Sequence, residues 1–183
     1  MIDDFTNPPA APRHAVDRAP ETLVWRAYEP GRDAQPLAGL FRAAILTLAA
    51  SHYDAAQREA WASGADDLDE FDARLARGVT IVACSGTEYA AFGQLFPGDH
   101  VEMLYVAPAW TRRGLASALI ARLEAIAREA QAVTLDTDAS ALARPVFERA
   151  GFSLVAQESV RRGSVSLPRF HLCKPLNAVS FSG

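Results

Sequence analysis

The fold of this chain is decided by one stretch, MLYVAPAWTRRGLASALI, at residues 103–120. Its apolar beginning, followed by Pro108, predicts a strand that is buried on both faces and ends at a turn. Apolar residues then recur at helical spacing over residues 112–130, which predicts a long amphipathic helix. A helix start presents unpaired backbone N–H groups and the positive end of the helix dipole. Because Gly114 and Ala116 are small, a phosphate could lie against the main chain there.

Arg112 and Arg113 add fixed positive charge to this turn. Neither G-x-x-x-x-G-K-[ST] nor G-x-G-x-x-G occurs in the sequence, which excludes a nucleotide-triphosphatase loop and a dinucleotide-binding fingerprint. The turn alone is also compatible with an ordinary strand–turn–helix unit in which Gly114 serves only close helix packing. Both interpretations stay open at the level of this one motif.

The periodicity of the whole chain predicts a mixed sheet of about seven strands with helices on both faces, in the α/β (α+β) class. Strands are expected at residues 22–28, 79–84, 89–96, 101–106, 132–137, 152–161 and 164–173. Helices are expected at residues 33–48, 54–61, 67–77, 112–130 and 140–150. Asp33 and Asp138 are expected to act as helix N-caps.

The length of 183 residues predicts one domain, which we place at residues 22–175. Residues 1–21 are rich in proline and lack a periodic apolar pattern, so they are expected to form a disordered tail, and residues 176–183 a second tail. Cys84 and Cys173 are too few for a disulfide framework or a zinc cluster. They are expected to be small apolar strand residues, and no metal site is expected.

The charge balance predicts no nucleic-acid and no membrane partner. The chain has 18 basic and 22 acidic residues and a net charge of −4, which gives no electrostatic footprint for a polyanion. It contains no uninterrupted run of 18 apolar residues, so no segment is expected to span a bilayer. Its N-terminal sequence lacks the basic and apolar regions of a signal peptide, which predicts a cytoplasmic protein.

Two blocks of sequence together resemble a known family. Residues 104–119 fit L-x-V-x-P-x-W-x-x-x-G-x-A-x-x-L, which resembles the acyl-CoA-binding motif of the Gcn5-related N-acetyltransferase (GNAT) superfamily. Residues 140–152, SALARPVFERAGF, resemble the family's second block, N-x-x-A-x-x-F-Y-x-x-x-G-F. Ser51-His52-Tyr53 with Trp61, the TRRG turn and the Arg-rich final hairpin resemble a YafP-like bacterial branch. The resemblance covers about residues 22–174.

The resemblance implies transfer of an acetyl group from acetyl-CoA directly to an amine of a small molecule or peptide. It also implies a sheet splayed between the fourth and fifth strands, at Val106 and Asp136, so that the thioester can enter. A main-chain N–H near Tyr105 would stabilise the oxyanion. The cofactor-binding residues implied are Leu104, Tyr105, Val106, Thr111, Arg112, Arg113, Gly114, Leu115, Ala116, Ser117, Ser140 and Phe147. Relatives often form homodimers through their terminal strands.

The sequence departs from the family pattern at three positions. Thr111 stands where Gln or Arg is usual, and Ser140 stands where Asn is usual. Phe147 replaces a Tyr that is placed in many relatives to protonate the departing thiolate. Because Phe147 cannot do this, either water or Tyr53 could supply that proton, and a catalytically silent acyl-CoA-binding sensor or docking module is the alternative function.

The acceptor amine also needs a base, since an amine with a pKa of about 10 is mostly protonated at neutral pH. Glu102 is the candidate, with His100 two positions earlier on the same strand face; alternatively, Glu102 is a strand carboxylate satisfied by a neighbouring Arg. The helices before residue 78 are expected to cover the acceptor. The candidate substrate-binding residues are His52, Tyr53, Trp61 and Asp136. For Tyr53, packing against Trp61 is the alternative role.

Overall fold

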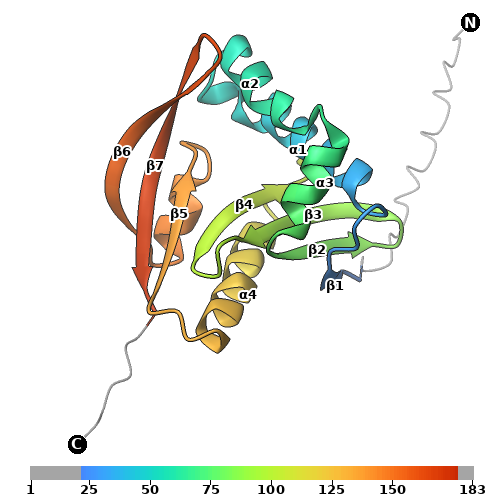
Figure 1. Ribbon diagram of the computed structural model, residues 1–183, viewed down its shortest axis with the longest axis vertical. Helices are drawn as coiled ribbons and strands as arrows, with labels where there is room; N and C mark the ends of the chain where they lie inside the picture. Colours follow the sequence, from blue (N-terminus) through green and yellow to red (C-terminus); the bar gives the residue numbers. More distant parts are fainter. Residues whose placement is uncertain (1–21, 177–183) are drawn as a thin grey trace, which may run out of the picture.

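The computed structural model describes residues 22–176, which form one mixed sheet of seven strands in the order β1-β2-β3-β4-β5-β7-β6 (Figure 1). The strands are β1 (Val24–Ala27), β2 (Val79–Ser85), β3 (Glu88–Leu95), β4 (His100–Val106), β5 (Thr134–Ala139), β6 (Ser153–Arg162) and β7 (Val165–Pro175). Neighbouring strands are antiparallel except for β4 and β5, which are parallel. The expected fold class and strand number are confirmed.

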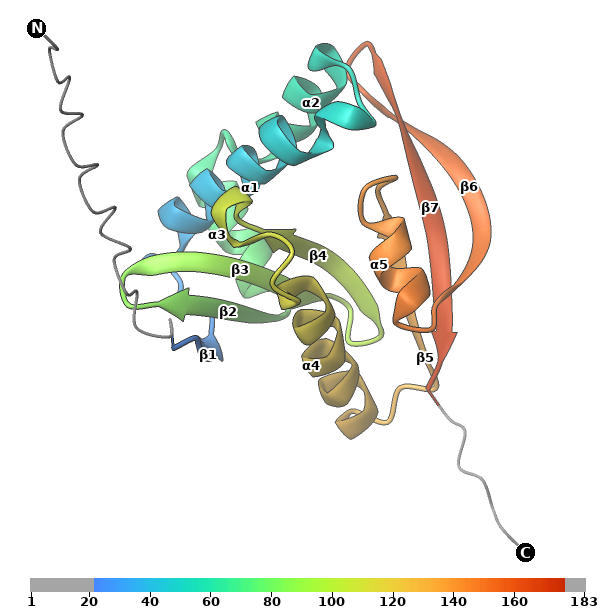
Figure 2. The ribbon, with the colours of Figure 1, turned by 180° about the vertical axis from the view of Figure 1, so that it is seen from behind.

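Helices cover both faces of the sheet (Figure 2). The α-helices are α1 (Ala34–Leu48), α2 (Ala55–Ala62), α3 (Leu68–Ala76), α4 (Leu115–Glu129) and α5 (Arg144–Arg149). Short 3-10 helices lie at η1 (Ala49–Ser51), η2 (Ser63–Ala65) and η3 (Pro108–Trp110). Val82 and Cys84 of β2 pack into a core with α1 and α3, whereas Ala83 between them packs with Leu115 and Leu119 of α4. Alternate residues of one strand therefore bury opposite faces of the sheet.

The sheet is forked between β4 and β5. These strands pair only at His100↔Asp136 and Val101↔Thr137, and the hydroxyl of Thr137 donates to the carbonyl of Val101 at 3.0 Å. Beyond Val101, β4 continues beside β3 as far as Val106 without a partner on its β5 side. The expected splay between the fourth and fifth strands is confirmed.

The apolar character of α1 is explained by the core. By length and composition alone, Ala34–Ser51 could cross a membrane, with a mean hydropathy of 1.2 over 18 residues. In the structure Leu37, Phe41 and Ile45 of this segment are buried in the cluster that also contains Phe92 of β3. The side chains that raise the hydropathy are thus those that pack on the sheet.

Asp33 precedes α1 as predicted, but its side chain does not cap the helix. The carboxylate is fully buried and accepts hydrogen bonds from Arg26 Nη1 at 2.6 Å, Arg26 Nη2 at 2.8 Å, the Tyr89 hydroxyl at 2.7 Å and the Glu29 amide at 2.8 Å. Burial alone would raise the pKa of Asp33, but these hydrogen bonds outweigh it and lower the pKa to about 2. Asp33 therefore occupies the N-cap position as predicted, but its side chain does not cap the helix, because an arginine offers a stronger partner than the helix amides.

The expectation that Asp138 caps the next helix is wrong. Asp138 lies within β5, and its carboxylate contacts Arg169 at 3.3 Å and His171 at 3.2 Å, both on β7. Residues 140–143 form a turn in which the Ser140 hydroxyl accepts from the Ala143 amide at 3.1 Å, and α5 begins only at Arg144. The Asp138 carboxylate is therefore bound by partners on β7 and does not cap α5.

The predicted domain limit falls one residue short. Leu176, assigned to the C-terminal tail, is buried, and its amide donates to the Val133 carbonyl at 2.9 Å. Its carbonyl accepts from Arg128 of α4. The predictions for residues 1–21 and 177–183 lie outside the described residues.

Replacing Asp33 with Asn should reduce the free energy of unfolding at pH 7 by about 2 kcal/mol, because the charged acceptor is lost. The folded-state pKa is about 2, below that of a free carboxyl. The stabilisation is therefore complete above about pH 4 and is lost as the pH falls toward 2. Urea unfolding at several pH values measures it, with the exposed Asp69→Asn as control. A difference between Asp33→Asn and wild type that does not shrink below pH 4 would contradict this assignment.

Candidate active site

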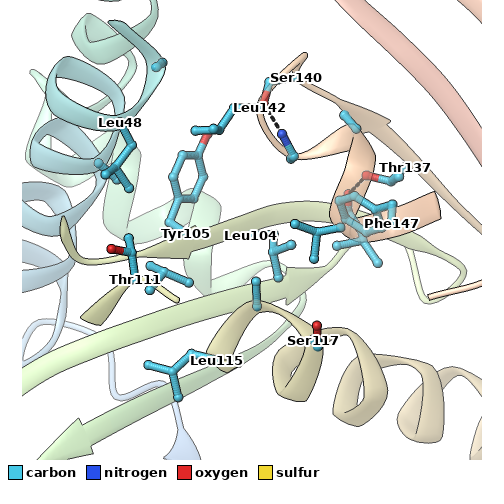
Figure 3. A pocket seen from close by; sticks show the side chains of 18 of the residues that line it. Leu48, Leu104, Tyr105, Thr111, Leu115, Ser117, Thr137, Ser140, Leu142 and Phe147 are labelled. Atoms are coloured by element: carbon cyan, nitrogen blue, oxygen red, sulfur yellow. Dashed lines mark hydrogen bonds between the residues drawn. The ribbon is translucent and has the colours of Figure 1, made fainter. Parts of the chain in front are cut away.

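A cavity of about 530 Å³ lies at the fork of the sheet (Figure 3). Its walls come from β4, the start of α4, the turn after β5, α5, and the end of α1. Most of the residues predicted to hold the cofactor line it: Leu104, Tyr105, Val106, Thr111, Arg112, Gly114, Leu115, Ala116, Ser117, Ser140 and Phe147. The exception is Arg113, whose guanidinium lies 4.6 Å from the ring centroid of Trp110, outside the cavity wall. Sequence motifs far apart in the chain thus meet around one space.

The turn before α4 has an unusual backbone. Gly114 has φ of +79° and Arg112 has φ of +62°, both in the left-handed region. A Cβ on Gly114 would meet nothing within 4 Å, so this glycine serves the backbone conformation rather than close helix packing. The packing interpretation of Gly114 is wrong for this reason. The turn is anchored by the buried Trp110.

The first amides of α4 face the cavity without a protein acceptor. Within residues 22–176 no hydrogen bond is formed by the amides of Leu115, Ala116 and Ser117, and Gly114 carries no side chain that could cap them. The hydroxyl of Thr111 is directed elsewhere, since it donates to the Pro108 carbonyl at 3.0 Å. Main-chain amides, rather than the Thr111 hydroxyl proton, are therefore the donors available to an anion here.

Glu102 lies at an irregularity in β4. The pairing with β3 steps from Gln94↔Met103 to Leu95↔Val101, which leaves Glu102 as the extra residue of a bulge. Its side chain lines the cavity, and its carboxylate lies 3.8 Å from His100 Nε2. In the described part of the chain no Arg forms an ion pair with Glu102, so the alternative of an Arg-satisfied carboxylate is not observed.

The Tyr105 phenol projects from β4 between Leu48 and the Ser140 turn (Figure 3). Its oxygen accepts from Trp61 Nε1 at 3.2 Å, and its ring stacks on Phe92 with centroids 5.4 Å apart. Burial raises the pKa of Tyr105 to about 12, so the phenol is neutral at physiological pH. Sequence reasoning assigned only the main chain of Tyr105 to the site and missed this hydroxyl, because a strand pattern does not show where a side chain ends.

A smaller cavity of about 180 Å³ adjoins the first. The two share Trp61, Glu102, Tyr105, Asp138 and Ser140. The far wall is supplied by the β6–β7 hairpin, with Val160, Arg162, Leu167, Pro168 and Arg169. The Arg-rich hairpin was visible in the sequence, but its position beside the site depends on strand order and could not be inferred from spacing.

The structure brings two of the four candidate substrate residues to the site. Trp61 lines both cavities and Tyr53 lines the smaller one. The Tyr53 ring packs against Trp61 with centroids 5.5 Å apart, and its hydroxyl donates to the Pro168 carbonyl at 3.0 Å and accepts from the Ala141 amide at 2.9 Å. Tyr53 therefore has the packing role, because both hydrogen-bonding functions of its phenol are used inside the protein.

His52 and Asp136 do not reach the site. His52 lies in the turn between η1 and α2, where it is exposed and lines neither cavity. Asp136 pairs with His100 at the closed end of the fork and also lines neither cavity. A hydrogen bond to its carboxylate, together with burial, raises the pKa of the Cys173 thiol to about 11. Residues 22–176 contain no group of three or more His, Cys, Asp or Glu suited to a metal ion.

Comparison with known proteins identifies the class. A family model described as an acetyltransferase (GNAT) domain matches residues 49–168. The chain therefore belongs to the GNAT family, which confirms the resemblance carried by its two motifs.

Relatives place it near a bacterial branch of that family. The uncharacterized N-acetyltransferase YafP of Escherichia coli strain K12 is 35% identical over 147 residues, covering 80% of this chain and 92% of YafP. A crystal structure of a GCN5-related N-acetyltransferase from Rhodopseudomonas palustris is 34% identical with a TM-score of 0.81, covering 84% of this chain and 96% of that one. PaiA N-acetyltransferase from Thermoplasma acidophilum, solved with coenzyme A, shares the fold at 15% identity, with a TM-score of 0.67 over 84% of this chain and 99% of PaiA. The Salmonella typhimurium protein YncA, solved with acetyl-CoA, shares it at 19% identity, with a TM-score of 0.62 over 85% of this chain and 95% of YncA.

Proposed function

We propose that this protein transfers an acetyl group from acetyl-CoA directly to an amine of a small molecule or peptide while both are bound. The observation that carries the proposal is that the α4 amides and the unpaired edge of β4 border the same cavity of about 530 Å³. The diphosphate of coenzyme A could lie at Gly114 while its extended pantetheine arm lies along Leu104–Val106. The complexes of PaiA with coenzyme A and of YncA with acetyl-CoA support this choice of co-substrate.

The residues of the fork have distinct tasks in this proposal. The α4 amides hold the diphosphate, and the unpaired edge of β4 aligns the pantetheine arm of the co-substrate by hydrogen bonds like those between strands. A main-chain N–H near Tyr105 stabilises the oxyanion that forms when the amine nitrogen attacks the thioester carbon. Holding both reactants beside one another can lower the barrier by roughly 7 kcal/mol or more.

The acceptor nitrogen starts as an ammonium and ends as an amide, so it loses two protons, while the leaving thiolate gains one. We propose that Glu102 takes the first proton from the nitrogen and passes it to solvent, because its carboxylate borders both cavities. The second proton leaves the nitrogen as the amide forms, and it restores the group that protonates the thiolate. Phe147 has no proton to give, and the Tyr53 hydroxyl is engaged by Pro168 and Ala141. We assign the proton that the thiolate gains to the neutral Tyr105 phenol. A cytoplasmic location and a homodimer stay predictions.

Replacing Gly114 with Glu should abolish most of the stabilisation that acetyl-CoA gives. The side chain has room, and the positive φ makes the substitution cost some stability, as it does in the control below; a carboxylate would stand before the α4 amides. At 100 times the dissociation constant, acetyl-CoA should stabilise the wild type by about 2.7 kcal/mol. Thermal unfolding with and without acetyl-CoA measures this difference.

Gly86→Glu is the matched control, because Gly86 also has a positive φ and open space but lines neither cavity. If Gly114→Glu responds to acetyl-CoA as strongly as Gly86→Glu, the diphosphate site is elsewhere. A thiol-release assay across an amine library then tests turnover. Tight acetyl-CoA binding with no coenzyme A released for any amine would favour the alternative of a silent acyl-CoA-binding module.

Replacing Glu102 with Gln should lower kcat/KM at neutral pH by about 100-fold, the usual contribution of a general base. The deficit should narrow as the pH approaches about 10, because the amine then loses its proton without help. A pH–rate profile measures it, with Glu88→Gln at the start of β3 as control. If kcat/KM of Glu102→Gln is lower than that of the wild type by the same factor at every pH, Glu102 does not take part in the proton transfer.

Replacing Tyr105 with Phe should lower kcat at least tenfold and leave acetyl-CoA affinity within twofold, because only the phenolic proton is removed. Single-turnover and binding measurements separate the two effects. An unchanged kcat would show that water protonates the thiolate. The comparison variant is Tyr89→Phe, which removes a hydroxyl from a tyrosine outside both cavities.

A further inference from the structure

Two arginines approach each other beside Gly64, and one of them, Arg162, lines the smaller cavity. Arg162 comes from the end of β6 and Arg74 from α3. Their Nη1 atoms lie 3.6 Å and 3.9 Å from one point, the position that a Cβ on Gly64 would occupy. Arg162 also lines the cavity wall opposite Trp61 and Tyr105. Two positive groups from elements far apart in the sequence thus meet beside the proposed acceptor pocket.

Neither of these arginines has a carboxylate partner. Within residues 22–176, no ion pair within 4.0 Å includes Arg74 or Arg162. The nearby Asp66 is paired with Arg42, and Arg169 on the same hairpin is paired with Glu158 and Asp138. Two of the acids in this region are therefore taken by other arginines, whereas Glu102 contacts only His100 within ion-pair distance among the described residues.

Arg74 is held in place with part of its hydrogen-bonding capacity unused. Its Nη2 donates to the Gly64 carbonyl at 3.2 Å, and its guanidinium lies 5.3 Å from the ring centroid of Phe71. Its buried Nε has no hydrogen-bond partner among the residues that the structure describes. Burial lowers the pKa of Arg74, and the charge of Arg162 acts in the same direction. Glu102 and Glu70 oppose this shift from a distance, but among the described residues no carboxylate lies within 4.0 Å of either arginine. A half-buried and an exposed arginine that lie close together in this way favour binding of an anion.

The smaller cavity, the proposed acceptor pocket, is lined by groups of both charges. Glu102 stands where the two cavities join, so an amine at that end would meet a carboxylate. Arg162 stands on the hairpin wall of the smaller cavity. We infer that the acceptor is an amine that also carries a carboxylate or phosphate group, which Arg162 binds from the cavity wall, with Arg74 adding positive charge behind it, while the amine faces Glu102. This inference rests on the proposed acetyl transfer and names its substrate class.

Turnover of matched amines tests the inference. We expect the wild type to prefer O-phosphoethanolamine to ethanolamine, or tyrosine to tyramine, by at least tenfold in kcat/KM. The pair that shows the preference identifies phosphate or carboxylate as the group bound. Arg162→Glu should remove the preference, so that the ratio of kcat/KM for the anionic amine to kcat/KM for the amine without the anionic group falls at least tenfold. Arg162 is exposed, so this variant should fold.

Arg161→Glu is the matched control. Arg161 is also exposed, precedes Arg162 on β6, lines neither cavity, and by strand alternation faces the opposite side of the sheet. The two variants change net charge equally, so a long-range electrostatic effect would appear in both. If Arg161→Glu loses the preference as Arg162→Glu does, the arginine pair is not the anion site.

A binding measurement that does not depend on turnover completes the test. Protein saturated with coenzyme A, which occupies the diphosphate site, is titrated calorimetrically with inorganic phosphate. We expect binding by wild type and Arg161→Glu and a loss of at least tenfold in affinity for Arg162→Glu. Turnover of uncharged amines without phosphate binding or anionic preference overturns the acceptor class and leaves the proposed function intact. Acetyl-CoA binding without turnover of any amine overturns the proposed function and the acceptor class with it.

Discussion

The site depends on a break in strand pairing. β4 and β5 are joined at two residue pairs and then separate, although both continue as strands. An unsatisfied buried main-chain group costs about 1–3 kcal/mol, so a sheet does not open unless the exposed edge meets water or a ligand. Here the unpaired edge of β4 borders the cavity of about 530 Å³, which has room for water or for a ligand. The bulge at Glu102 lies just beyond the last pair, where β4 has to turn away from β5.

The closed end of the fork is held by charge as well as by strand pairing. Lys174 on β7, the only lysine in the chain, donates to Glu124 of α4 at 2.7 Å and to the Ala150 carbonyl after α5 at 2.7 Å. Burial alone would raise the pKa of Glu124, but the hydrogen bonds from Lys174 and Arg128 lower it. Since α4 packs on β3 and β4, this contact ties the two halves of the sheet together below the point where they separate.

Sequence patterns predicted the frame of the site better than its polar detail. The strand–turn–helix around Gly114 could be predicted from the glycine in a left-handed turn and the apolar stripe of the helix, and the family motif assigned the cofactor residues to it. Eleven of the twelve predicted cofactor residues therefore line the cavity. The side-chain roles of Asp33 and Asp138 were misassigned because each has a partner from another strand, and cross-strand partners leave no mark in local spacing. The same limit hid the convergence of Arg74 and Arg162, whose positions are 88 residues apart.

The open end of the fork is bridged by side chains instead of strand pairing, and this fixes the shape of the acceptor pocket. The Tyr53 hydroxyl joins the Pro168 carbonyl of β7 to the Ala141 amide after β5, while its ring packs on Trp61. Trp61 in turn donates to Tyr105 on β4, so one chain of contacts crosses from one half of the sheet to the other. A shift of β7 is therefore expected to move Trp61 and, through its hydrogen bond, the Tyr105 phenol, because the hydrogen bonds in such a network depend on one another. Because Arg162 is carried by the strand paired with β7, the arginine that we propose binds an anion and the phenol that we propose protonates the thiolate are connected by the same contacts.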